Sequence, residues 1–178
     1  LGLRLKQGVD FDLTNLDDDP RFNDYWQHYL QIMERHGVTP SAAKAIVRSR
    51  STVVAALMLK RGEVDAMLCG IVGKYQGKLK HVINIIGIDP NVSCISALSV
   101  VISDKGPLFF TDTHVQNQPN AEQIAEATLQ AAYRMKLFGI VPKVALVCHS
   151  NFGTSEAASA KKLREALQLI LAKSPRLE

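Results

Sequence analysis

One loop of the sequence combines glycines and lysines at a spacing that suits a phosphate-bearing ligand. The loop spans residues 69–78, reads CGIVGKYQGK and carries Lys74 and Lys78, with Lys80 two residues further on. Glycines allow a ligand to approach the backbone, lysines supply positive charge, and the amino end of a following helix favours anions. The loop matches neither a dinucleotide-binding GxGxxG motif nor a Walker motif. An ordinary strand–helix connection with solvated lysines therefore stays open as the alternative.

A second polar loop, residues 149–155, reads HSNFGTS and also precedes a predicted helix. Ser150 and Asn151 offer hydroxyl, amide and backbone donors, which an anionic or carbonyl ligand requires. The simpler alternative is that Ser150 or Thr154 caps the helix. Two arginines, Arg48 and Arg50, are further candidates for phosphate binding, against the alternative that they are ion-paired or solvated.

Hydrolytic and metal-dependent chemistry have weaker support. His149 and Ser150, with Asp112 and His114 elsewhere, contain the residue types of a catalytic triad, but HSNFG lacks the first glycine of a GxSxG elbow. No HExxH or comparable pair supports a metal site. The three acids at 17–19 precede a predicted helix, where negative charge favours the helix dipole. We therefore predict neither a hydrolytic triad nor a metal site here.

Composition excludes several classes of function. The chain has 178 residues, a net charge of +4 and 47% hydrophobic residues, which is typical of a globular protein with a sizeable core. No basic run is interleaved with aromatics, so we expect no nucleic-acid partner, and no apolar stretch has membrane-spanning length. Three cysteines without CxxC spacing indicate reduced thiols and a cytoplasmic location. The absence of an initial methionine suggests a piece of a larger protein.

Alternating helix and strand signals predict an α/β fold. Helix starts are expected at Asp19-Pro20, Thr39-Pro40, Ser51 and Asn120, the last with Gln123 as a capping box. Strands are expected at 64–68 and 144–148, each before one of the polar loops, and at 94–103 and 107–113 as a hairpin. We therefore predict a layered α/β/α fold with a mostly parallel sheet, in which the loops share one edge.

Two long segments resemble the phosphotransacetylase (phosphate acetyl/butyryl transferase) family. The first begins at residue 38 and reads VTPSAAKAIVRSRSTVVAALMLKRGEVDAMLCG, and the second begins at residue 119 and reads PNAEQIAEATLQAAYRMKLFGIVPKVALVCHSNFGTSE. The resemblance covers nearly the whole chain. It implies an architecture like that of isocitrate and isopropylmalate dehydrogenases, with 1–87 as part of a first lobe and 88–178 as a second lobe, truncated at its C-terminus.

Three shorter segments resemble the phosphotransacetylase-like C-terminal domain of bacterial hybrid NADP-dependent malic enzymes. They read CGIVGKYQGKLKHVINIIG, FFTDTHVQNQPNAEQ and CHSNFG. In phosphotransacetylases the glycine loop carries threonines, and an arginine–proline pair, whose arginine is catalytic, starts the next helix. Here Lys74 and Tyr75 stand at the threonines and Lys80-His81 at the pair. The family's other catalytic residues are expected beyond Glu178. The resemblance therefore implies a domain without catalytic residues of its own.

The resemblance also implies a role. Such a domain is expected to bind acetyl-CoA as an allosteric inhibitor and to assemble a homo-oligomer beside a malic enzyme catalytic domain. That catalytic domain would use NADP and a divalent metal, Mg²⁺ or Mn²⁺, to convert malate to pyruvate and CO2. The predicted ligand-binding residues are Gly70, Lys74, Tyr75, Lys80, Ser150 and Asn151. An active acyltransferase and a purely structural assembly domain remain as alternatives.

Overall fold

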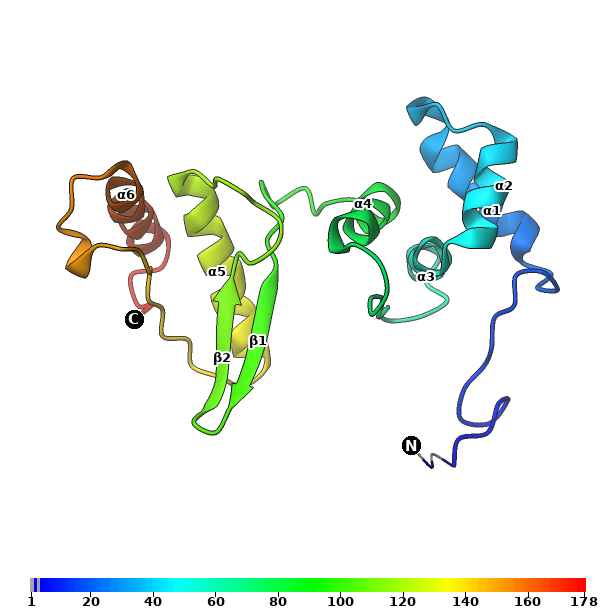
Figure 1. Cartoon of the computed structure of the whole chain (residues 1–178), viewed down its shortest axis with the longest axis horizontal. Coiled ribbons are helices and arrows are strands. Elements are labelled where there is room, and N and C mark those ends of the chain that lie inside the picture. The colour runs from blue at the N-terminus through cyan, green and yellow to red at the C-terminus, as the bar shows by residue number, and fades with distance from the viewer. Residues whose placement is uncertain (1, 3) are drawn as a thin grey trace. The chain divides into compact units, whose positions relative to one another are not determined.

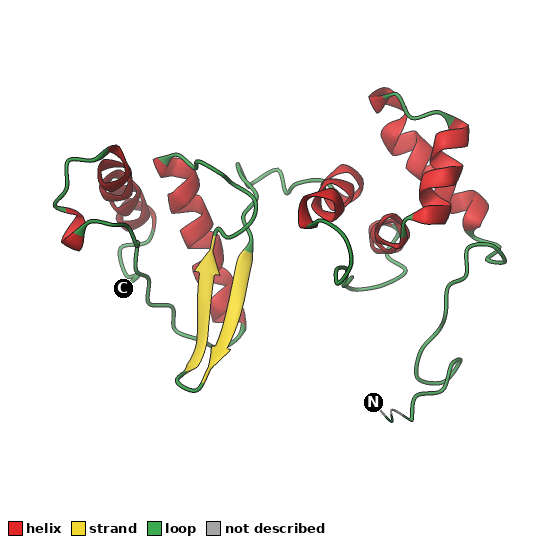
Figure 2. Ribbon diagram, viewed as in Figure 1, coloured by secondary structure: helices red, strands yellow, loops and turns green. Residues whose placement is uncertain are grey.

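The computed structural model describes residues 2 and 4–178 and divides into two compact units, Leu1–Gly87 and Ile88–Glu178. Each unit is described by itself (Figure 1). The first unit is helical, and the second combines helices with the strands, as the colouring by secondary structure shows (Figure 2).

Within residues 2 and 4–87, the first unit contains four α-helices. They are α1 (Phe22–Met33), α2 (Pro40–Ser49), α3 (Ser51–Lys60) and α4 (Tyr75–Ile86), with the short 3-10 turn η1 (Glu34–His36) after α1. Helix α1 packs against the other three, and α3 packs along α4. Every helix contributes apolar side chains to one core, whose largest fully buried members are Tyr25, Val47, Val53, Leu57 and Ile85.

A local sequence signal explains where one of these helices, α2, begins. The Thr39 hydroxyl accepts the Ala42 N–H at 3.3 Å and proline follows at the first helical position, so the predicted start of α2 is confirmed. The predicted start at Asp19-Pro20 is wrong, because α1 begins at Phe22. The Asp19 carboxylate instead accepts hydrogen bonds from the backbone and guanidinium of Arg21, at 2.8 and 2.7 Å, and these bonds stabilise a turn before the helix.

The second unit is built around a β-hairpin and two helices. Strands β1 (Leu98–Ser103) and β2 (Gly106–Thr111) pair antiparallel, and this confirms the predicted hairpin. Helix α5 (Ala121–Leu137) packs against β2 and against α6 (Ala158–Lys173), which follows the 3-10 turn η2 (Asn151–Gly153) (Figure 1). The predicted capping box at the start of α5 is present, with Asn120 and Gln123 bonded reciprocally at 2.8 and 2.9 Å.

The fold is α/β, but the mostly parallel sheet is not found. Within residues 2 and 4–178, the sheet is the two-stranded antiparallel hairpin, and the predicted strands 64–68 and 144–148 have no strand pairing, with a bend at Asp65. The Val144 N–H donates to the backbone oxygen of Glu178 at 2.8 Å, and Val147 is 84% exposed. An apolar run indicates a preference for burial, but only a neighbouring backbone with matching donors and acceptors makes it a strand.

None of the helices within the described part of the chain is long and apolar enough to cross a membrane.

Candidate functional site

The glycine–lysine loop predicted at residues 69–78 is an exposed turn only as far as Lys74, because α4 begins at Tyr75. Gly70 and Gly73 have φ values of +153° and +91°, in the region that favours glycine. The Val72 N–H donates to the Gly70 carbonyl at 2.8 Å, which tightens the turn. Within the described residues, open space surrounds the position that a Cβ of Gly70 would occupy. The backbone of this loop is therefore accessible to a ligand.

Three of the predicted ligand-binding residues lie at the amino end of α4. Lys74 immediately precedes the helix in an extended conformation, and its side chain does not cap the helix. Tyr75 is the first helical residue and is 47% exposed. Lys80 lies in the second turn and is exposed. An exposed helix start with two lysines close by suits an anion.

Lys78 links this loop to the first turn of α3. Its Nζ lies 3.5 Å from the hydroxyl oxygen of Thr52, a residue that is 5% exposed. Its Cε lies 4.0 Å from the position that a Cβ of Gly73 would occupy. The Lys78 side chain therefore runs along the loop and ends at α3, so the glycine loop and the start of α3 belong to one site.

His81 and Arg50 add to the positive side of this site. His81 is half-buried, and burial holds its pKa below the usual range. The nearby positive charges of Arg50, Lys80 and Lys78 lower the His81 pKa further. The imidazole is therefore mostly neutral at pH 7.

Arg48 and Arg50, which the sequence left as equal candidates, have different surroundings. Arg48 forms an ion pair with Asp17 at 3.4 Å and lies 4.6 Å from the centroid of the Phe22 ring. Arg50 is exposed and forms no ion pair among the residues that the structure describes. Arg50 is therefore the arginine that is available to an anionic ligand.

Ser150 stabilises the second polar loop, residues 149–155, and its hydroxyl is already hydrogen-bonded within that loop. Its hydroxyl accepts the Ser155 N–H at 2.9 Å, and its own N–H donates to the Cys148 sulfur at 3.3 Å. Arg164 donates to the carbonyl of Ser155 at 2.8 Å and to that of Gly153. The Ser150 carbonyl accepts from the Cys148 Sγ at 3.8 Å, so Asn151, which is exposed, is the residue of this pair that is available to a ligand.

The structure disfavours a triad at Asp112. Its carboxylate accepts backbone N–H groups from Ala97, His114, Val115 and Gln116, at 2.6–3.2 Å. His149 lies near the Ser159 hydroxyl, at 3.5 Å. Asp112 thus organises a turn instead of orienting a histidine. Among the described residues, no group of three or more His, Cys, Asp or Glu is placed to hold a metal ion.

The predicted site residues are divided between the two units. Gly70, Lys74, Tyr75 and Lys80 lie in the first, and Ser150 and Asn151 lie in the second. In the first unit the structure groups Lys78 and Lys80 with Arg50 and His81, which sequence reasoning did not connect. A sequence signal for this group exists, because no acidic residue lies between Asp65 and Asp89.

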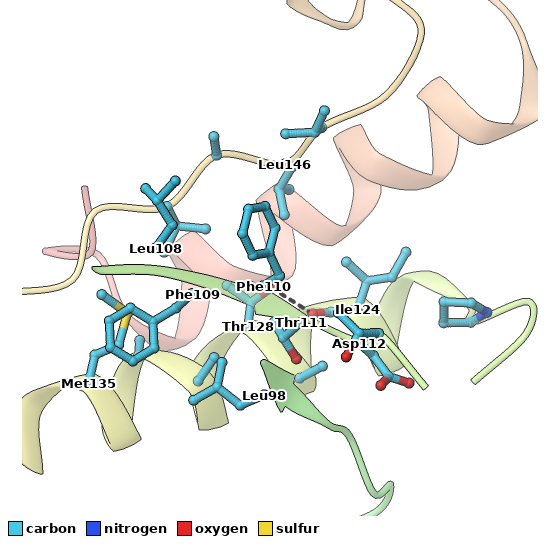
Figure 3. A pocket seen from close by; sticks show the side chains of 18 of the residues that line it. Leu98, Leu108, Phe109, Phe110, Thr111, Asp112, Ile124, Thr128, Met135 and Leu146 are labelled. Atoms are coloured by element: carbon cyan, nitrogen blue, oxygen red, sulfur yellow. Dashed lines mark hydrogen bonds between the residues drawn. The ribbon is translucent and has the colours of Figure 1, made fainter. Parts of the chain in front are cut away.

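The second unit also contains an apolar cavity of about 620 Å³ that none of the predicted residues lines. Figure 3 shows Leu98, Phe109 and Met135 on one side of it and Leu146 on the other, with Asp112 near one end. The side-chain oxygen of Gln116, also in the lining, is buried without a hydrogen-bond partner among the described residues. The cavity lies between β2, α5 and residues 143–147.

Filling this cavity is expected to stabilise the chain. Ala127 is 5% exposed and lines it, so an Ala127→Leu side chain would occupy space that is now empty. We expect the free energy of unfolding to rise by about 1 kcal/mol, from the added buried methylenes less some strain. Urea denaturation measures the free energy of unfolding, and Ala45→Leu on the exposed face of α2 is the control substitution. Destabilisation by Ala127→Leu would show that the space is not available.

Comparison with solved structures places this fold among known ones. A phosphotransacetylase from Streptococcus pyogenes matches 94% of this chain and 51% of its own, with a TM-score of 0.80 and 22% identity. EutD phosphotransacetylase from Staphylococcus aureus matches 94% of this chain and 50% of its own, with a TM-score of 0.77 and 20% identity. The chain therefore has a phosphotransacetylase type of fold.

The family assignment follows from sequence comparison. The family described as Phosphate acetyl/butaryl transferase matches residues 1–178, and the chain belongs to this family. This result confirms the family resemblance found in the sequence.

Sequence identity to individual curated relatives shows which members of the family this chain resembles more. The chain is 49% identical to an NAD-dependent malic enzyme from Rhizobium meliloti and 45% identical to an NADP-dependent malic enzyme from Escherichia coli, each over 99% of this chain and 23% of the relative. It is 31% identical to a phosphate acetyltransferase from Synechocystis over 95% of this chain and 25% of the relative. The chain spans about a quarter of the length of these relatives, and it is more similar to the malic enzymes than to the acetyltransferase.

Proposed function

We propose that this chain is a ligand-sensing and oligomerising C-terminal domain of a malic enzyme, and that it binds acetyl-CoA without catalysing acetyl transfer. The similarity to malic enzymes supports the assignment to that kind of protein. The observation that carries the ligand proposal is the cationic, acid-free surface formed by the glycine–lysine loop, Arg50 and α4. Acetyl-CoA is a polyanion, and such a surface favours it.

In the longer protein, the catalytic domain would decarboxylate malate oxidatively to pyruvate and CO2. NADP and Mg²⁺ or Mn²⁺ would be bound there rather than in this chain, whose described residues offer no metal-ligand cluster. Acetyl-CoA would act as an inhibitor by binding one state of the oligomer more tightly than the other. The three unpaired cysteines are compatible with the cytoplasmic location that we propose for this protein.

We also propose that the two units correspond to parts of the two lobes of a phosphotransacetylase-like domain. In the longer protein, residues 64–68 and 144–148 would pair as parallel strands with neighbouring backbone. The exposed apolar side chains of Leu68 and Val147 support this part of the proposal.

The lysine at position 80, which stands where the family has a catalytic arginine, favours ligand binding over catalysis of acetyl transfer. Lysine at position 80 keeps the positive charge of the family's catalytic arginine, but its ammonium group cannot form the planar bidentate contact that a guanidinium makes. An active acyltransferase would have to orient acetyl-CoA and phosphate and stabilise charge at the carbonyl oxygen. Without that contact, a site can still bind the anion while losing much of the stabilisation of the transition state.

Lys80→Ala is expected to weaken acetyl-CoA binding about tenfold, since a charge-assisted contact is worth about 1.5–3 kcal/mol. Calorimetric titration measures the affinity, and a thiol-release assay with added phosphate measures acetyl transfer to phosphate. Lys105→Ala, in the hairpin turn of the second unit, is the control and should leave binding unchanged. Release of CoA thiol would instead identify an acyltransferase. If the chain sediments as an oligomer but shows no acetyl-CoA binding and no thiol release, it would be a structural assembly domain.

A further inference from the structure

The apolar cavity of the second unit is large enough for a small molecule. Its volume of about 620 Å³ falls within the range of small-molecule sites. Its walls come from strand β2, helix α5 and residues 143–147, with Phe109 and Met135 on one side and Leu146 on the other (Figure 3). Side chains that border empty space lack contacts on that side, so an apolar molecule that entered the cavity would gain them.

The side-chain amide of Gln116, which lines this cavity, uses only one of its two ends. Its Nε2 donates to the Ile95 carbonyl at 2.9 Å. Reversing the amide would place two acceptor oxygens against each other, so this bond fixes which end is the oxygen. That oxygen, Oε1, is buried and has no hydrogen-bond partner among the described residues. A buried acceptor without a donor is unfavourable, and a ligand that supplies a hydroxyl or N–H would satisfy it.

Charge near the Gln116 end of the cavity disfavours an anionic ligand. The Gln116 N–H donates to the Asp112 carboxylate at 2.6 Å, so the free acceptor and the carboxylate belong to one turn. Burial raises the pKa of Asp112, but the backbone N–H groups outweigh it and hold the pKa below its usual range, so Asp112 is ionised at neutral pH. Lys143, also in the lining, is already paired with Glu178 at 2.9 Å. A negative group would be repelled here, whereas a neutral hydroxyl or N–H would not.

We propose that this cavity binds a neutral apolar molecule that carries a hydroxyl or N–H group, with Gln116 Oε1 as the acceptor of its hydrogen bond. The apolar walls supply the affinity, and the single unpartnered acceptor selects a molecule with a donor. The inference goes beyond the proposed function, because none of the residues predicted to bind acetyl-CoA lines the cavity. It therefore describes a separate site for a ligand of different chemistry.

The test is calorimetric titration of the whole chain with n-octanol and with octanoate, which have the same number of carbon atoms and differ in charge and in the hydroxyl donor. Wild-type chain is expected to bind octanol with saturation and octanoate about tenfold more weakly. Gln116→Leu is expected to weaken octanol binding about fivefold, because one neutral hydrogen bond is lost. Gln118→Leu, at an exposed position of the same loop that does not line the cavity, is the matched control and should bind octanol as the wild type does.

Ala127→Leu tests the location, because its side chain would occupy the cavity, and it is expected to weaken octanol binding at least about tenfold. Ala45→Leu on α2 should leave octanol binding unchanged, and circular dichroism shows whether each variant is folded. Octanol binding that Ala127→Leu does not weaken would overturn the inference, as would equal effects of Gln116→Leu and Gln118→Leu. No octanol binding by a wild-type chain that Ala127→Leu stabilises would show that protein rather than a ligand fills this space, and would also overturn it. Acetyl-CoA affinity should be equal in Ala127→Leu and wild type, so the two proposals fail separately.

Discussion

Tyr25→Ala is expected to lower the free energy of unfolding of the first unit by about 3–5 kcal/mol, the range for truncating a buried aromatic residue. Tyr25 is fully buried in the helical core, and its hydroxyl donates to a Glu63 carboxylate oxygen at 2.6 Å. The guanidinium carbons of Arg21 and Arg61 lie 5.6 and 5.2 Å from the centroid of its ring. The substitution therefore removes apolar contacts, a charge-assisted hydrogen bond and two cation–π contacts together.

Fluorescence of Trp26 measures this effect, because it is the one tryptophan of the sequence and lies in α1 beside the substituted residue. Tyr133→Ala, at an exposed position of α5, is the control and should cost less than about 0.5 kcal/mol. Tyr25→Phe separates the hydroxyl from the ring and should cost about 2 kcal/mol, because Glu63 loses a bonded donor. A Tyr25→Ala effect no larger than that of Tyr133→Ala would contradict the central place of this side chain.

Burial and the hydrogen bond between Tyr25 and Glu63 also shift the pKa values of these two residues. Burial, followed by the hydrogen bond to Glu63, raises the pKa of Tyr25 to about 12. The hydrogen bond from Tyr25, together with Arg61 and Arg21, lowers the pKa of Glu63 below its usual value, against the opposing effect of burial. Tyr25 therefore stays protonated and Glu63 ionised throughout the neutral pH range, as donor and acceptor respectively.

Asp112→Ala is expected to destabilise the second unit by about 3 kcal/mol, because several backbone N–H groups lose their acceptor at once. The carboxylate bonds the N–H of Ala97, just before β1, and those of His114, Val115 and Gln116 in the turn after β2. It thereby ties the two ends of the hairpin together. Hydrogen exchange at these four amides measures the loss directly, and Asp104→Ala in the exposed hairpin turn is the control.

The contribution of Asp112 to stability also depends on pH. Burial alone would raise the pKa of Asp112, but the backbone N–H groups outweigh it and hold the pKa below the ordinary value of 3.8. For a carboxyl group with a lowered folded-state pKa, the stabilisation is present above the unfolded-state pKa and is lost as the pH falls through the folded-state pKa. Stability should therefore fall below about pH 4, and Asp112→Asn should reduce that fall. An unchanged acid transition in Asp112→Asn would contradict this assignment.

Several local features followed from the sequence alone, because each depends on residues a few positions apart. The start of α2 at Thr39-Pro40 and the capping box of Asn120 and Gln123 are side-chain to backbone contacts within one turn. The hairpin followed from two apolar runs separated by a short polar turn. The family followed from motifs that retain their order along the chain, and the comparison confirmed it.

Only the tertiary structure decided which distant residues meet. Tyr25 and Glu63 are 38 residues apart, and Lys78 and Thr52 are 26 apart, so no local pattern brings them together. Residues 64–68 and 144–148 have the composition of strands, yet pairing depends on neighbouring backbone that composition does not describe. The sequence by itself determined the family and the caps at the starts of α2 and α5. Packing of α3 against α4 determined that Arg50, rather than Arg48, lies near His81 with the lysines of α4, because Asp17 and the ring of Phe22 already hold Arg48.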